Sequence, residues 1–229
     1  MGFKCRLLSR SLVRVSGTGS HEFLQGLFTN DLRSLQPGCS IWGCFLHYTG
    51  RVMCDAYLYQ LTQPGTDDPV ILVDVHQTVS TALVEHLKEM RLRRKVHIED
   101  VGKELAVVAT SSPEKPPLPG RGSLSLEGSE TFEDPRSFAF PAPLYKTILP
   151  AAHTPSVSDP ESTYDSFLHA SGVGEGPDVF RPSKSLPFEA NADFLRGVSF
   201  HKDAIWGRTH PPDARHVSYT KAYNSFFNR

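Results

Sequence analysis

Cysteine is scarce and poorly spaced, which excludes the simplest metal and redox sites. The four cysteines are Cys5, Cys39, Cys44 and Cys54, and no two of them form a CxxC pair. A zinc knuckle or a thioredoxin-type site therefore has no support. Because a chain of 229 residues can bury a core without disulfide staples, we expect reduced thiols.

Charge of one sign and long apolar runs are also lacking. The 24 Lys and Arg residues nearly balance the 25 Asp and Glu residues. This balance excludes a generally basic nucleic-acid surface and an acidic solvating tail. Because of this balance, we expect no nucleic-acid partner. No uninterrupted apolar run approaches the ~20 residues that a membrane-spanning helix needs, so we also expect no membrane span.

The familiar catalytic and metal-binding motifs are missing. The ten histidines form no HxH or HExxH pattern, and no GxSxG elbow is present. The sequence GVGEG at 172–176 lacks both a following Lys-Ser/Thr and a preceding strand, so we interpret it as a turn. Without such motifs, the sequence supports only an α+β protein whose reaction cannot be assigned. It predicts no metal site.

The amino terminus allows two interpretations. Lys4, Arg6, Arg10 and Arg14 precede the first acidic residue, with serines between them, as in a mitochondrial targeting segment. The alternation of apolar and polar residues over 12–15 favours an ordinary β-strand instead.

Apolar spacing predicts a mixture of short strands and helices. A helix with Ser20 as its N-cap places Phe23, Leu24, Leu27 and Phe28 on one face. A second helix carries apolar residues spaced 4, 4 and 3 apart, at Val79, Leu83, Leu87 and Met90. We expect a strand pair over 40–47 and 51–61, further strands over 69–75, 96–98, 105–109 and around Leu124 and Leu126, and a short helix around 164–168.

Proline is enriched, with 18 residues, and marks the organisation of the chain. We expect a first α+β domain over 1–110, a proline-rich loop over 111–122 and a second α+β region over 123–202. Residues 203–229 form a separate tail in this division.

Two segments far apart in the chain carry a resemblance to a known family. The first holds FLQGLFTNDL at 23–32 and GRVMCD at 50–55, and the second holds LPFEAN at 186–191 and GVSFHK at 197–202. Together with MRLRRKV at 90–96, they resemble the folate-binding, aminomethyltransferase-like family, which includes the glycine-cleavage T-protein. Within that family they are most similar to the mitochondrial iron–sulfur cluster assembly factors.

The resemblance implies both a fold and a function. It implies two intertwined α+β domains around a central cavity, with the C-terminal β-barrel of the family missing here. It implies a role in late maturation of [4Fe–4S] apoproteins in the mitochondrial matrix, together with A-type iron–sulfur scaffolds. The chain would contact an iron–sulfur cluster only through these partners. A non-enzymatic factor is favoured over the alternative, a folate-dependent aminomethyl transferase.

The resemblance also suggests binding residues for tetrahydrofolate. They are Asn30, Asp31, Arg51, Asp55 and Lys202, with Asp55 nearest to the acidic residue that faces folate in the T-protein. The downstream folate motif of the T-protein has no counterpart near 136–140. Ordinary helix capping by Asn30 and Asp31 and a surface position for Arg51 remain open alternatives.

The family pattern stops at Lys202. The family continues with Gly-Cys-Tyr-x-Gly-Gln-Glu, whereas this chain has Asp203-Ala204-Ile205-Trp206-Gly207-Arg208. Dropping one base from a coding sequence for Gly-Cys-Tyr-Met-Gly-Gln yields the observed residues. We therefore expect a frameshifted, disordered tail over 203–229, with a natural divergent tail as the alternative. In either case the signature cysteine, whose thiolate suits iron, is lost, and we expect an impaired factor.

Overall fold

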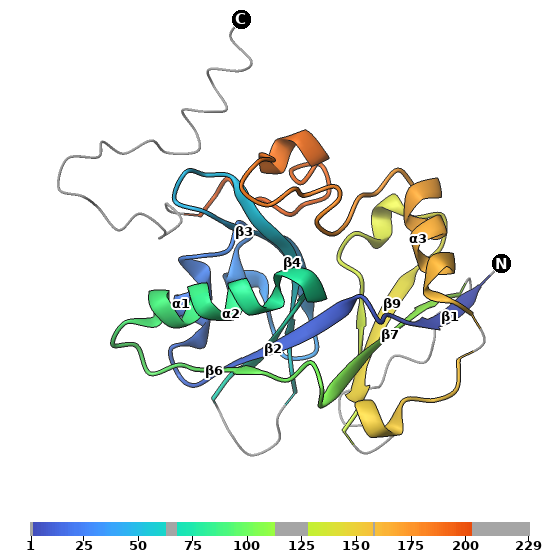
Figure 1. Ribbon diagram of the computed structural model, residues 1–229, viewed down its shortest axis with the longest axis horizontal. Helices are drawn as coiled ribbons and strands as arrows, with labels where there is room; N and C mark the ends of the chain where they lie inside the picture. The colour runs from blue at the N-terminus through green and yellow to red at the C-terminus, as the bar shows by residue number, and fades with distance from the viewer. Residues whose placement is uncertain (1, 63–67, 113–127, 158, 203–229) are drawn as a thin grey trace, which may run out of the picture.

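Two antiparallel β-sheets and three α-helices make up the described part of the chain (Figure 1). The computed structural model describes residues 2–62, 68–112, 128–157 and 159–202. The expected tail over 203–229, the expected strand at 124–126 and most of the loop over 111–122 lie outside the described residues. These three expectations stay predictions.

The larger sheet has the strand order β3-β4-β5-β2-β6. Its strands are β2 (Arg10–Ser16), β3 (Ser40–Leu46), β4 (Val52–Gln60), β5 (Val70–His76) and β6 (His97–Asp100). The predicted hairpin over 40–47 and 51–61 and the predicted strand over 69–75 are confirmed. The residues of the ambiguous amino terminus form β2, which pairs along its full length with β5.

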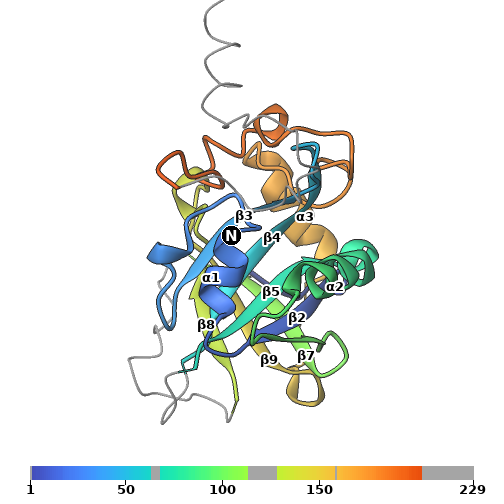
Figure 2. The ribbon, with the colours of Figure 1, turned by 90° about the vertical axis from the view of Figure 1, so that its left-hand side faces the viewer.

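Two helices cover the outer face of this sheet, α1 (Ser20–Gln25) and α2 (Gln77–Arg91) (Figure 2). Their buried side chains, including Phe23, Leu24, Leu83 and Leu87, join one apolar core with the outward residues of the strands. The predicted N-cap is wrong by one residue, because Gly19 holds that position. The hydroxyl of Ser20 donates to the carbonyl of Gly17 at 2.7 Å instead of accepting from a helix amide.

The smaller sheet has the order β1-β7-β9-β8. Its strands are β1 (Phe3–Arg6), β7 (Leu105–Ser111), β8 (Glu130–Glu133) and β9 (Leu144–Pro150). Helix α3 (Glu161–Ala170), predicted around 164–168, packs beside β1 (Figure 1). Because β1 and β7 pair into the same sheet as β8 and β9, hydrogen bonding crosses the expected domain boundary at 110.

Short 3-10 helices and turns complete the described chain. The 3-10 helices are η1 (Leu32–Ser34), η2 (Ser137–Ala139), η3 (Ala151–His153) and η4 (Pro187–Ala190). Residues 171–202 run across the β3–β4 hairpin, drawn in orange in Figure 1, and the amide of Val52 donates to the carbonyl of Ser185 at 2.9 Å. No helix within the described ranges is both long and apolar enough to cross a membrane.

Candidate functional site

The two segments that carry the family resemblance meet in space. Thr29, which follows α1, is 1% exposed. Its hydroxyl donates to the carbonyl of Gly197 at 2.6 Å and accepts from the amide of Cys44 in β3 at 2.8 Å. Its carbonyl accepts from the amide of Ser199 at 3.0 Å. We call this contact between 28–33 and 196–202 the signature junction.

Asn30 lies in the signature junction as a structural link. Its side-chain amide donates to the carbonyls of Trp42 and Arg196, both at 2.8 Å. Its side-chain oxygen accepts from the amide of Asp31 at 2.8 Å. The N-cap of η1 is the neighbouring Asp31, so the expected capping role is not that of Asn30, which instead links its own segment to the distant one.

Asp31 is held by a neighbouring cation. Its carboxylate pairs with Arg33 at 2.6 Å and caps η1 by accepting from the amide of Arg33. The hydrogen bonds from Arg33 lower the pKa of Asp31 to about 2. This carboxylate is ionised at neutral pH and already has partners.

Lys202 closes the signature junction from the other side. Its ammonium donates to the carbonyls of Gln25, of Phe28 at 2.5 Å and of Asn30 at 3.2 Å. Cations suit carbonyl groups at the end of a helix, which lack partners within the helix. Burial lowers the pKa of Lys202 to about 8. The three hydrogen bonds hold Lys202 in place at the signature junction.

Two glycines allow the segments to approach this closely. A Cβ on Gly197 would lie 2.5 Å from a ring carbon of Trp42, and a Cβ on Gly43 would lie 2.7 Å from the carbonyl oxygen of Gly197. Real Cβ atoms do not approach other atoms so closely. Next to Gly197, Arg196 has a φ of 58°, a left-handed conformation that is costly for a residue with a side chain.

Asp55 lies elsewhere, in the interior between the sheets. It shares the inward face of β4 with Tyr57 and Tyr59, because side chains alternate along a strand. The carboxyl group is 2% exposed, and one oxygen accepts from the amide of Gly176 at 3.1 Å. The other oxygen has no hydrogen-bond partner among the described residues. Burial raises the pKa of Asp55.

A cluster of buried charges surrounds Asp55. Arg10 pairs with Asp74 at 2.6 Å, and Arg136 pairs with Asp134 at 3.0 Å. The guanidinium of Arg136 also stacks over the rings of Trp42 and Tyr57, at 5.1 and 4.9 Å from their centroids. These cations come from both sides of the interior, since Arg10 lies in β2 and Arg136 follows β8. We call this group, completed by Lys146 and Glu175, the interior charge cluster.

Burial shifts the acid–base properties of the interior charge cluster. It raises the pKa of Asp134 to about 7 and lowers that of Lys146 to about 8. The ammonium of Lys146 lies 3.2 Å from the centroid of the Tyr57 ring, and it has no hydrogen-bond partner in the described structure. A buried polar group without a hydrogen bond is costly, so Lys146 and Asp55 are candidate contacts for a polar ligand.

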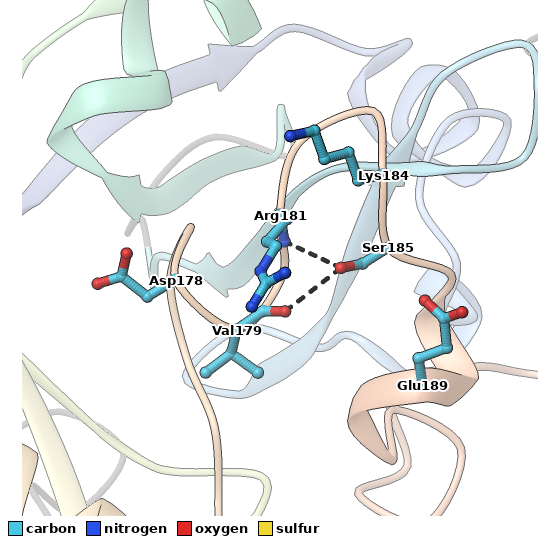
Figure 3. A pocket seen from close by; sticks show the side chains of 6 residues that line it. All are labelled: Asp178, Val179, Arg181, Lys184, Ser185 and Glu189. Carbon is cyan, nitrogen blue, oxygen red and sulfur yellow. Dashed lines mark hydrogen bonds between the residues drawn. The ribbon is translucent and has the colours of Figure 1, made fainter.

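Arg51 is separate from both groups of residues. It is exposed, directly before β4, and donates to the carbonyl of Lys184. A shallow pocket of about 480 Å³ nearby is lined by Asp178, Val179, Arg181, Lys184, Ser185 and Glu189 (Figure 3). Two cations and two carboxylates line it, so it offers no excess charge to an anion. None of the five predicted binding residues lines it.

The structure thus brings together three of the five predicted residues. Asn30, Asp31 and Lys202 meet at the signature junction, whereas Asp55 faces the interior and Arg51 lies on the hairpin. Sequence reasoning missed the interior charge cluster, above all Glu175 in the GVGEG turn. A charged residue inside an apolar strand, such as Asp74 in β5, was the available signal.

The cysteines do not form a metal site in the described ranges. Cys5, Cys44 and Cys54 are buried, Cys39 is exposed, and all four are free thiols. No group of three His, Cys, Asp or Glu side chains in these ranges is arranged to hold a metal ion. Burial raises the pKa of Cys5 to about 11, so its thiol is protonated at neutral pH.

Comparison with known proteins gives the following relatives. No family model matches the chain. It is 33% identical over 215 residues to the iron-sulfur cluster assembly factor IBA57 homolog, mitochondrial, of Mycosarcoma maydis, covering 87% of this chain and 50% of that protein. It is 31% identical over 222 residues to IBA57, mitochondrial, of Mus musculus, covering 89% and 60%. The chain thus spans roughly half the length of the curated relatives it matches.

A solved structure shares the fold. The glycine cleavage system aminomethyltransferase T from Bartonella henselae superimposes with a TM-score of 0.56 at 14% identity, over 81% of this chain and 55% of that one. The family resemblance predicted from the two separated segments is confirmed. The chain is therefore similar, over most of its own length, to the IBA57 iron–sulfur cluster assembly factors, and it shares the fold of the aminomethyltransferase T structure.

Proposed function

We propose that this protein belongs to the late maturation of [4Fe–4S] proteins in the mitochondrial matrix, as an assembly factor. One observation carries the proposal: the two segments most similar to the family are held together at the signature junction by Thr29, Asn30 and Lys202. The names of the curated relatives, which include mitochondrial iron–sulfur cluster assembly, support it. The proposal includes two intertwined domains around a cavity.

The proposed partners are A-type iron–sulfur scaffolds and [4Fe–4S] apoproteins. A thiolate is a soft ligand suited to an iron–sulfur cluster. In the resembled family a cysteine follows two residues after the lysine that Lys202 matches, and here that position holds Ala204. The surface of the signature junction would still dock a scaffold, but this chain would lack the group that engages the cluster. We therefore propose an assembly factor that binds its scaffold and is impaired in cluster transfer.

A matched pair of chains tests this function. The protein and its Asp203→Gly/Ala204→Cys/Ile205→Tyr variant are mixed with a cluster-loaded A-type scaffold and separated by gel filtration. We expect both to co-elute with the scaffold, and only the variant to retain iron and sulfide in the complex. Failure of both chains to co-elute would overturn the assembly-factor proposal. Equal iron retention by both would overturn the role assigned to the cysteine.

Tetrahydrofolate is proposed as a ligand of Asp55. The residues fit it in one respect, because the unpartnered, buried oxygen of Asp55 can accept a hydrogen bond from an N–H group of the pterin ring. When bound, tetrahydrofolate supplies a nitrogen that carries one-carbon units, and Asp55 would hold and orient its pterin end.

Calorimetric titration with tetrahydrofolate tests this ligand. We expect binding by the unaltered chain, loss of binding in Asp55→Ala, and retained binding in the surface control Asp178→Ala. Equal affinities of the two variants would contradict the assignment. The alternative function, aminomethyl transfer, is not favoured, because the curated relatives are named as assembly factors and the likeness to the transferase shows only the fold.

A further inference from the structure

The carboxylate of Glu175 lies at the centre of the interior charge cluster. Arg10 donates to one of its oxygens and Arg136 to the other, both at 2.9 Å. The hydroxyls of Tyr57 and Tyr164 donate to the second oxygen at 2.6 and 2.9 Å. These four donors come from β2, β4, the segment after β8, and α3. Separate elements of the fold therefore converge on a single carboxylate.

Lys146 adds a third cation from β9. Its ammonium lies 3.9 Å from Glu175, and the side chains of Arg10, Arg136 and Lys146 are at most 2% exposed. Buried cations require compensating charge, and Glu175 is the acid that all three share. Burial alone would raise the pKa of Glu175, but the charges of Lys146, Arg10 and Arg136 lower it to about 2. The site is thus built for an anion.

Glu175 belongs to a different kind of element from the residues that bind it. The donors stand on strands, on α3 and beside η2, whereas Glu175 stands on the turn that joins α3 to the segment 177–202. Gly172 and Gly176 border this turn with φ values of 67° and 77°, conformations that glycine adopts at little cost. The site belongs to the packed fold, and its anion is delivered by a connecting turn.

We propose that the interior charge cluster is a carboxylate-binding site which this chain fills with its own Glu175. A small carboxylate bearing the same two oxygens would bind there when Glu175 is withdrawn. The ligand and Glu175 then compete, so that ligand binding releases the turn and loosens the following segment, which ends at the signature junction. This inference does not depend on the proposed assembly function, because the probe is formate and the readout is folding.

Chemical rescue of a truncated side chain tests the proposal. In Glu175→Ala the three cations lose their shared anion, and we expect Tm to fall by roughly 10 °C. Replacing sodium chloride by sodium formate at equal concentration is expected to recover several degrees in this variant. The unaltered protein and Glu130→Ala are expected to show the same Tm in both salts. Glu130 is a matched control because its carboxylate accepts from Thr62.

The isosteric variant Glu175→Gln sharpens the test. Its amide fills the same space, so we expect a lowered Tm that does not respond to formate. An equal response of Glu175→Ala to formate and chloride would overturn the proposal, as would an equal formate response in Glu175→Gln. If Glu175→Ala does not fold in chloride, refolding in the two salts is followed by circular dichroism. Recovery in formate alone supports the site, and recovery in neither salt overturns it.

Discussion

Replacing Thr29 with Val perturbs the signature junction at its centre. The two side chains have nearly the same shape, so the change removes the hydroxyl and leaves the packing almost intact. The hydroxyl donates to the carbonyl of Gly197 and accepts from the amide of Cys44, in a position that is 1% exposed. Both backbone groups would lose this partner, and water cannot easily reach them.

The magnitude follows from these two groups. A buried donor or acceptor left without a partner costs about 1–3 kcal/mol, so Thr29→Val, which leaves one of each, is expected to lower the free energy of unfolding by roughly 2–6 kcal/mol. For a domain of this size, that loss corresponds to a fall in Tm of roughly 5–15 °C. The segment 196–202 should also become more sensitive to limited proteolysis, because Thr29 holds it against β3.

Thermal unfolding followed by circular dichroism measures this effect. The matched control is Thr154→Val, whose hydroxyl donates to the carbonyl of Ala151 at 3.0 Å in a partly buried turn. We expect the control to cost about 1 kcal/mol or less, because water can replace its hydrogen bond. Equal unfolding temperatures of the two variants, or unfolding of Thr29→Val at the temperature of the unaltered chain, would show that the Thr29 hydroxyl does not stabilise the signature junction.

Further predictions concern the signature junction and the interior. Gly197→Ala should lower the urea midpoint, because its Cβ would lie 2.5 Å from the Trp42 ring, whereas Gly172→Ala, with open space around its Cβ, should cost only the strain of its positive φ. Lys202→Met should cost about 1.5–3 kcal/mol in denaturant unfolding, because a charged donor to three carbonyls is lost. Glu175 has its pKa lowered to about 2 from 4.5, so its stabilisation is present above pH 4.5 and is lost as the pH falls toward 2. Acid titration of Glu175→Gln should therefore show a shallower stability loss over that range than the unaltered chain.

Local elements could be predicted from the sequence because their signals are local. The 4, 4, 3 spacing of apolar residues identified α2. Of these residues, Leu83 and Leu87 are fully buried, and the terminal pair, Val79 and Met90, is partly buried. The hairpin of β3 and β4 followed from two apolar runs joined at 48–50. The N-cap of α1 was misplaced by one residue, because capping depends on the backbone conformation of Gly19 as well as on residue type.

Contacts between distant segments could not be predicted in the same way. Pairing of β1 with β7 depends on which edges meet, and periodicity along one strand does not contain that information. Lys146 and Arg136 lie in a stretch broken by prolines, where apolar spacing is weak. Glu175 lies between glycines in a turn, with no pattern to indicate burial. Asn30 and Lys202 were identified through the family resemblance, and their role in joining two segments appears only in three dimensions.

The proposed assembly function is tested most directly by [4Fe–4S] enzyme activity in cells depleted of their own IBA57-type factor. Two chains are expressed at equal levels and directed to mitochondria: the unaltered chain and its Asp203→Gly/Ala204→Cys/Ile205→Tyr variant. Separately, cDNA sequencing over residues 200–229 establishes the reading frame. We expect restored activity with the variant and none with the unaltered chain. Restoration by the unaltered chain would contradict the role assigned to the cysteine, and restoration by neither chain, although both are folded and imported, would contradict the assembly function.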